Sequence, residues 1–174
     1  MTLYPPLLLK YLKMYQDDPS SRIFAPLSEC YRKIGMADEA IEICKEGIAA
    51  NPDFTGGKVA LARAYFDKKM YAEARELLLP VIDRIPDNIV AQKLLADASL
   101  FLGYFKDALN AYKMLLYFNP ADHDVARTVQ ELETQSYEQG GVIKGGGRPE
   151  KLRKLVKLQK LLTRVQRAQG FIVG

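Results

Sequence analysis

The chain has 174 residues, of which 48% are hydrophobic, and this is enough to bury the core of one ordinary domain with an appendage. Two cysteines are too few for a disulfide scaffold, and no stretch approaches the ~20 apolar residues of a membrane span. No signal-peptide pattern opens the chain, so a cytoplasmic location is expected. The net charge of +4 is uneven, because the residues from Arg148 onward carry eight Lys or Arg and a single acid.

Residues 1–20 are predicted to form an N-terminal capping helix. Pro5 and Pro6 precede an apolar pattern that ends before the Asp17-Asp18-Pro19 stretch. The apolar positions expected to cover the first unit of the following array are Leu8, Leu9, Leu12 and Tyr15.

A repeat of 34 residues follows. Pro52, Pro86 and Pro120 recur at this period, which divides the chain into segments 21–54, 55–88 and 89–122 without gaps. Aligned, the segments share a column of leucine, a column of small residues, a column of alanine, and a turn position between their halves. These columns are Leu27, Leu61 and Leu95; Ser28, Ala62 and Ala96; Ala40, Ala74 and Ala108; and Gly35, Lys69 and Gly103.

This pattern resembles the tetratricopeptide repeat (TPR), over about 100 residues by its period. The resemblance implies two antiparallel helices in each segment, with the small residues permitting close helix approach and the proline ending the second helix. The predicted fold is therefore all-α: a right-handed α-solenoid of three TPR helix pairs with flanking helices. Asp53, Asp87 or Asn88, and Asp122 are available to cap the helices that follow them.

The middle of the array departs from the family pattern. The bulky column near the start of each first helix holds Phe24, but then Lys58 and Gln92. The Gly56-Gly57 pair is expected to weaken the start of the first helix in the middle segment, because glycine is a poor helix former.

Three further segments follow the repeats. Residues 123–138 predict a C-terminal capping helix that packs through Val125, Val129 and Leu132. Residues 139–148 contain five glycines and predict a flexible linker, and residues 170–174 form an apolar tail.

Residues 149–169 predict a basic amphipathic helix with two stripes. The apolar stripe is Leu152, Leu155, Leu158, Leu162 and Val165, and the basic stripe is Arg153, Lys157, Lys160, Arg164 and Arg167. This helix would dock on a partner or on a second copy through its leucines, giving a homo-oligomer in the latter case. Alternatives are contact with nucleic acid or an anionic membrane, which is less favoured, and folding back on its own acidic body.

The TPR resemblance implies a concave groove lined by the first helix of each pair. The lining residues would be Arg22, Ala25, Glu29, Arg32, Lys33, Val59, Arg63, Phe66, Asp67, Lys93, Asp97 and Phe101. Such a mixture of cations and aromatic residues suits an extended or helical peptide with some negative charge. Some family members bind a chaperone's C-terminal carboxylates with a Lys/Asn clamp, but the corresponding positions here are Ala25, Glu29 and Ala60, so that ligand is not predicted.

Nothing in the sequence predicts an enzyme or a cofactor. The one histidine, His123, has no cluster of metal-ligating residues around it in the sequence, and the glycine run lacks the order of a phosphate-binding loop. The leading prediction is a non-catalytic adaptor or scaffold that binds a peptide or protein in the groove and uses the last helix as a second docking element. The alternatives are a small chaperone for an unstructured client, by analogy with type III secretion chaperones, and a membrane- or nucleic-acid-tethering module acting through the basic helix.

Overall fold

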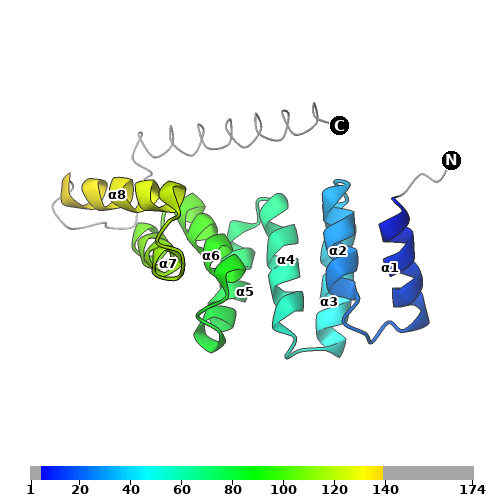
Figure 1. The fold of residues 1–174 in the computed structure, drawn as a ribbon. Helices are drawn as coiled ribbons and strands as arrows, with labels where there is room; N and C mark the ends of the chain where they lie inside the picture. Colours follow the sequence, from blue (N-terminus) through cyan, green and yellow to red (C-terminus); the bar gives the residue numbers. More distant parts are fainter. Residues whose placement is uncertain (1–4, 139–174) are drawn as a thin grey trace.

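A computed structural model describes residues 5–138 of the chain, which form α-helices joined by short turns, with no strand in that range (Figure 1). The helices are α1 (Pro6–Asp17), α2 (Phe24–Lys33), α3 (Ala37–Ala50), α4 (Thr55–Asp67), α5 (Tyr71–Arg84), α6 (Ile89–Leu102), α7 (Phe105–Phe118) and α8 (His123–Glu138). The predicted all-α, right-handed solenoid is confirmed. The predicted linker 139–148, basic helix 149–169 and apolar tail 170–174 lie outside the described residues.

Each 34-residue segment contains one antiparallel helix pair, namely α2 with α3, α4 with α5, and α6 with α7. The pairs stack in sequence order, and α8 lies across the end of the array (Figure 1). The first helices also contact one another, α2 with α4 and α4 with α6, whereas the second helices of the described pairs make no comparable contacts. The array therefore curves with α2, α4 and α6 on its inner side, which we call the inner face.

Small residues set the spacing between the helices. Ser28, Ala62 and Ala96 on the first helices are at most 1% exposed. The alanine column on the second helices, Ala40, Ala74 and Ala108, is fully buried. A larger side chain at any of these positions would push the two helices of a pair apart, because a packed interior has no free volume to accept it.

The turn between the two helices of each pair has the same geometry three times. Gly35, Lys69 and Gly103 all have positive φ, at 86°, 62° and 86°. In each turn the next residue donates its backbone N–H to a carbonyl five residues earlier, as Met70 does to Tyr65 at 2.9 Å. This is the Schellman ending of a helix, which favours glycine at the left-handed position. Lys69 is the one non-glycine residue with positive φ in the described range.

Two of the three expected helix caps form. The side chain of Asn88 accepts a hydrogen bond from the Ala91 N–H at 3.0 Å, and Asp122 accepts one from the Val125 N–H at 3.1 Å. The expectation for Asp53 is wrong, because Phe54 occupies the N-cap position of α4 and makes no side-chain cap bond. The Asp53 carboxylate instead pairs with Arg84 at the surface.

Phe24 is the largest fully buried side chain, and its ring packs against two glycines. A Cβ built at Gly47 would lie 2.1 Å from the ring, and one at Gly57 would lie 2.5 Å from it. Phe54 adds an edge-to-face contact at 5.7 Å between ring centroids. Gly57, which was expected to weaken α4, is thus the residue that lets α4 approach Phe24.

Gln92 takes the place of a bulky side chain in the third unit. It is 3% exposed, and its side-chain amide donates to the backbone carbonyl of Pro86 at 3.0 Å. The buried amide is therefore hydrogen-bonded, as burial of a polar group requires.

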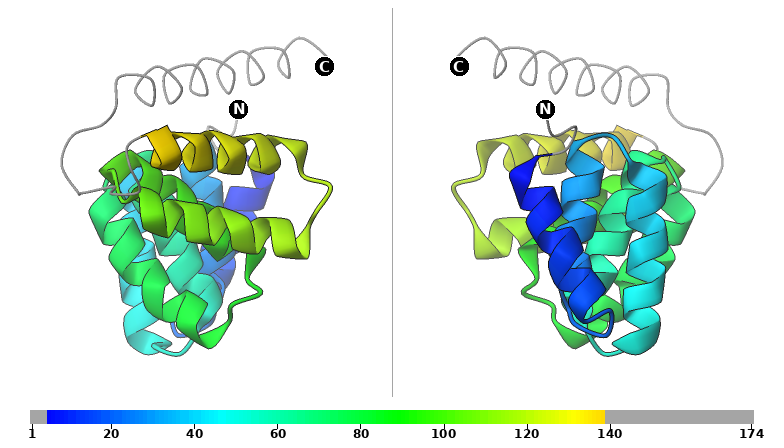
Figure 2. Two further views of the ribbon diagram at one scale, coloured as in Figure 1. Left: turned by 90° about the vertical axis from the view of Figure 1, so that its left-hand side faces the viewer. Right: turned by 90° about the vertical axis from the view of Figure 1, so that its right-hand side faces the viewer.

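The two end helices differ in what they leave to solvent. Val125, Val129 and Leu132 of α8 are buried against α7, as predicted. On α1, Leu8 is buried, but Leu7 and Met14 face outward with 51% and 40% of their surface exposed. The two views in Figure 2 place α1 and α8 at opposite ends of the array. None of the described helices is long and apolar enough to cross a membrane.

The first prediction concerns the contact between Phe24 and Gly47. We expect Gly47→Ala to lower the free energy of unfolding by about 1–3 kcal/mol, because the ring has no space to move away from the added methyl group. In a Phe24→Ala background the same substitution should instead stabilise the protein by up to about 1 kcal/mol through helix propensity. Urea unfolding of the four variants measures both effects, and an equal effect in the two backgrounds would contradict the contact.

The second prediction concerns the left-handed turn position. Lys69→Gly should raise the free energy of unfolding by about 0.5–1 kcal/mol, because glycine adopts positive φ without the steric cost that a side chain incurs. Gly35→Ala, at the equivalent turn with open space around the Cβ position, is the reverse test and should lower stability by roughly 1 kcal/mol. Thermal or urea unfolding measures the change in the free energy of unfolding for each variant. Changes of opposite sign support the shared turn geometry, and changes of the same sign contradict it.

Candidate functional site

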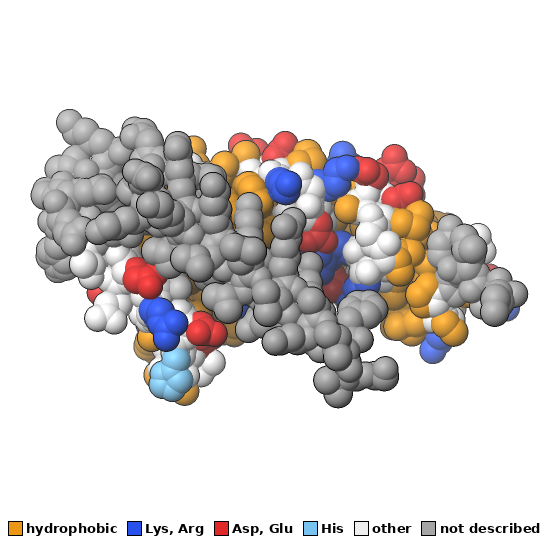
Figure 3. All heavy atoms as spheres, turned by 90° about the horizontal axis from the view of Figure 1, so that it is seen from above, with side chains coloured by type: hydrophobic (Ala, Val, Ile, Leu, Met, Phe, Trp, Pro, Cys, Tyr) orange, Lys and Arg blue, Asp and Glu red, His pale blue; other side chains and the backbone are white. Residues whose placement is uncertain are grey.

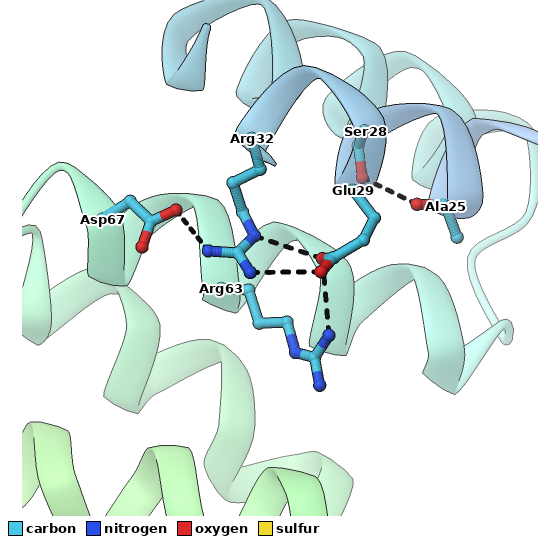
Figure 4. Close-up of polar contacts among 6 residues, drawn as sticks. All are labelled: Ala25, Ser28, Glu29, Arg32, Arg63 and Asp67. Atoms are coloured by element: carbon cyan, nitrogen blue, oxygen red, sulfur yellow. Dashed lines mark hydrogen bonds and ion pairs between the residues drawn. The ribbon is translucent and has the colours of Figure 1, made fainter. Parts of the chain in front are cut away.

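The inner face carries a connected chain of four charged side chains from two helices (Figure 4). Arg32 of α2 donates to the Glu29 carboxylate from Nε at 3.1 Å and from a terminal nitrogen at 3.2 Å. Its remaining terminal nitrogen pairs with Asp67 of α4. Arg63, also on α4, reaches the same Glu29 carboxylate at 3.3 Å. Sequence reasoning placed these residues in the groove, and the structure brings all four together.

This network shifts the protonation of its members. Burial by itself would raise the pKa of Glu29, but the hydrogen bond and charge of Arg32 and the charge of Arg63 outweigh it and lower that pKa. A lowered carboxylate pKa stabilises the fold above the unfolded-state pKa, and this contribution is lost as pH falls through the folded-state value. Arg32 uses all three guanidinium nitrogens internally, so it has little capacity left for a ligand.

An aromatic cluster adjoins the network where α4 and α6 end. Phe66 of α4 and Phe101 of α6 lie edge to face with ring centroids 5.6 Å apart. Tyr71, at the start of α5, stacks on Phe101 at 4.4 Å and meets Phe66 at 5.0 Å. Both phenylalanines are half-buried, so the cluster offers apolar surface at the edge of the inner face. Sequence reasoning missed Tyr71, although the aligned position in the third unit, Phe105, is also aromatic.

Asp97 of α6 is tied to the core rather than directed to solvent. The Tyr112 hydroxyl donates to its carboxylate at 2.6 Å. Burial raises the pKa of Asp97, while the Tyr112 hydrogen bond and the charge of Lys93 oppose the shift. The pKa of Tyr112 is also raised, first by its own burial and then by the Asp97 carboxylate. Asp97 therefore contributes an internal hydrogen bond rather than a free acid for a ligand.

A hollow of about 700 Å³ opens at the edge of the array beside this network. It is lined by Arg32, Lys33, Gly35, Ala37, Asp67 and Lys68. Lys68 pairs there with Asp38 at 2.8 Å. Figure 3, which views this edge from above, shows basic and acidic side chains intermingled over the middle of the array. The hollow is thus polar, and most of its charges are already paired.

The other predicted groove residues lie in three different settings. Arg22 precedes α2, and its guanidinium lies over the ring of Phe54 at 5.0 Å. Val59 is 9% exposed and packs in the core between the first helices and α5. Lys33 and Lys93 are exposed, and neither makes a salt bridge with a described residue. The predicted apolar and basic stripes of 149–169 lie outside the described residues.

Side chains that could bind a metal ion do not gather in the described part of the chain. No group of three or more His, Cys, Asp or Glu side chains suited to a metal ion occurs within residues 5–138. His123 is exposed at the start of α8. Burial raises the pKa of the Cys44 thiol to about 11, which makes it a weakly reactive core residue.

Comparison with known proteins yields one family. A family model described as tetratricopeptide repeat matches residues 31–97, which run from the end of α2 into α6. No curated protein sequence gives a significant match.

Solved structures of similar shape include some that are named as tetratricopeptide-repeat domains or proteins. The first TPR of Spaghetti (RPAP3), bound to an HSP90 peptide, superposes with a TM-score of 0.61 at 20% identity, covering 67% of this chain and 95% of that one. MamA AMB-1 superposes with a TM-score of 0.64 at 25% identity, covering 74% of this chain and 70% of the MamA chain. A thermophilic TPR protein of Thermus thermophilus gives 0.60 at 19% identity, covering 73% of this chain and 71% of that one.

The third prediction follows from the raised pKa of Asp97. A carboxyl whose pKa is raised by folding favours the folded state when protonated, and this contribution is lost as pH rises through the folded-state pKa. Asp97→Asn keeps an oxygen that accepts from Tyr112 and removes the charge, so we expect it to stabilise the protein at pH 7 by on the order of 1 kcal/mol. The gain should shrink toward zero near pH 3. Urea unfolding of both proteins across this range is the measurement, and a pH-independent difference would contradict it.

Proposed function

We propose that this chain is an adaptor that binds a peptide segment of another protein on its inner face. Residues 31–97 match the tetratricopeptide-repeat family model, and members of that family are generally non-catalytic protein-interaction modules. Two observations carry the proposal: the aromatic cluster at the ends of α4 and α6, and the cations Lys33, Arg63 and Lys93 on the three first helices. The ligand is an acidic segment with an apolar anchor residue.

The distribution of charge supports an acidic ligand. Helices α2, α4 and α6 carry five basic and three acidic residues, whereas the second helices α3, α5 and α7 carry five basic and eight acidic residues. An acidic segment is thus attracted to the inner face and repelled from the outer one, which favours one mode of encounter. Three cations offer hydrogen-bond donors there: Lys33 and Lys93 make no salt bridge with a described residue, and Arg63 uses one terminal nitrogen on Glu29.

The aromatic cluster supports an apolar anchor. Phe66 and Phe101 are held in place by their mutual contact and by Tyr71, so they lose little side-chain entropy when a ligand binds. A surface that combines aromatic rings with cations matches the composition of residues that dominate binding energy at protein interfaces. A Leu or Phe side chain of the ligand would cover the exposed edges of these rings.

The ligand differs from a chaperone C-terminus held by a carboxylate clamp. The RPAP3 structure is that of a related fold with an HSP90 peptide, but at 20% identity it bears on the fold alone. The clamp's Lys and Asn positions correspond here to Ala25, Glu29 and Ala60, whose side chains lack the hydrogen-bond donors that such a clamp uses.

The fourth prediction tests charge recognition with the full chain. A display library of short peptides, each with a Leu or Phe flanked by either Glu or Lys, is the probe. We expect enrichment of the Glu-flanked peptides, and Lys93→Glu or Lys33→Glu should weaken the best of them roughly tenfold, which is about 1.4 kcal/mol. Both lysines are exposed, so the reversals should leave the fold intact.

The matched control is Lys45→Glu, which reverses an exposed charge on the outer helix α3. It should change affinity by less than about twofold at physiological salt, where distant exposed charges are screened. Enrichment of Lys-flanked peptides, or an equal loss with Lys45→Glu, would place the ligand elsewhere and overturn the proposal.

A further inference from the structure

Helix α7 has an apolar outer surface that the other second helices lack. Met114, Tyr117 and Phe118 are 37%, 78% and 40% exposed, and Tyr117 meets Phe118 edge to face at 5.4 Å. A hollow of about 480 Å³ lies on the same side, lined by Asn110, Lys113, Met114 and Tyr117. We call Met114, Tyr117 and Phe118 with this hollow the α7 ledge.

The repeat alignment indicates that the α7 ledge is a specific feature of the third unit. At the positions of Met114, Tyr117 and Phe118, the second unit has Pro80, Asp83 and Arg84, and the first has Glu46, Ala49 and Ala50. The position of Asn110 is a glutamate in both earlier units, Glu42 and Glu76. The third unit thus carries three large apolar side chains where the earlier units have charged residues, alanines or a proline.

The core of α7 lies on its opposite side. Ala108, Ala111, Tyr112 and Leu115 are buried, and they pack with Val125, Val129 and Leu132 of α8. The views in Figure 2 place α7 and α8 together at one end of the array. Because large apolar side chains grouped on a surface mark a contact site, the α7 ledge needs an occupant.

We propose that the occupant is the chain's own segment 149–169, docked in cis on the α7 ledge through the predicted apolar stripe of that segment. The described chain ends at Glu138, at the end of the helix that packs on α7. Ten residues, 139–148, separate this point from the segment, and ten residues span up to about 33 Å. Helix α8 is about 24 Å long, so the linker reaches any part of α7.

The charge pattern of the segment fits this placement. On a helix with 3.6 residues per turn, the basic stripe from Arg153 to Arg167 lies on the side opposite the apolar stripe from Leu152 to Val165. When the leucines face the α7 ledge, the basic residues therefore point away from it. Lys113, the one cation lining the hollow, is paired with Glu133 of α8 at 2.6 Å and does not repel the segment.

Tethering favours docking in cis over docking on a second copy. A short flexible linker gives an effective concentration in the millimolar range. A contact with an intrinsic Kd of about 0.1 mM is then about 90% formed within one chain, but below about a tenth formed between chains at ~10 µM protein.

The fifth prediction is measured on the full chain by hydrogen exchange of the amides in residues 149–169, with the mass determined by sedimentation. In the unchanged protein we expect a monomer in which these amides exchange roughly tenfold more slowly than in the double variant Met114→Ser/Tyr117→Ser. The control is Leu79→Ser, which changes an exposed leucine on the equivalent outer surface of α5 and should preserve the slow exchange.

A fluorescence measurement tests the same contact with a reporter on the α7 ledge. The chain has no tryptophan, so Tyr117→Trp supplies a single reporter on the α7 ledge. Its emission should shift to longer wavelength when Leu155→Ser and Leu158→Ser are added, because the ring becomes solvated. Three results would each overturn the proposal. One is a dimer that dissociates when the leucines are changed, another is equal amide exchange in the ledge variant and the unchanged chain, and the third is an emission wavelength that the leucine changes leave unaffected.

Discussion

Close approach between helices is the constraint on which this structure depends. The buried small residues, Ser28, Ala62 and Ala96 on the first helices and the alanine column on the second, bring the two helices of each pair into direct contact. Phe24 is held between glycines of α3 and α4 for the same reason, since no other residue leaves room for its ring. Because each pair can bury its apolar side only against its neighbours, the spacing set at these positions also sets the curvature of the array and the existence of an inner face.

The inner face combines groups that serve the fold with groups left for a partner. The ion pairs among Glu29, Arg32, Arg63 and Asp67 join α2 to α4, and most of these charges are paired with one another. Asp97 is bound to Tyr112 in the same way. In the proposed function, recognition uses the pair of exposed lysines, the spare donors of Arg63 and the half-buried rings of Phe66 and Phe101. The proposed binding surface is therefore smaller and more cationic than a count of its residues suggests.

The inner face and the α7 ledge have separate physical origins and need not compete. The inner face arises from the stacking that every unit shares, so the repeat architecture itself produces it. The α7 ledge arises from a departure in one unit, where Met114, Tyr117 and Phe118 replace charged or small residues of the earlier units. A chain with both features can hold one segment on its inner face while its outer face is covered by another.

Periodicity and residue size, which are local properties, were enough to predict the helical class, the 34-residue units, the burial of the small columns and the packing of α8. The groove residues were assigned from the repeat pattern, but Val59 lies in the core and Asp97 is bound to Tyr112. Which charges are cancelled depends on the assembled fold, because ion pairs such as Arg32 with Asp67 join residues one repeat apart. Two other expectations also changed in the assembled fold. Gly57 was expected to weaken α4, but it is required for close packing against Phe24. Asp53 was expected to cap α4, but Phe54 occupies the N-cap position. These contacts depend on the distances between helices, and those distances cannot be predicted from the sequence of one helix alone.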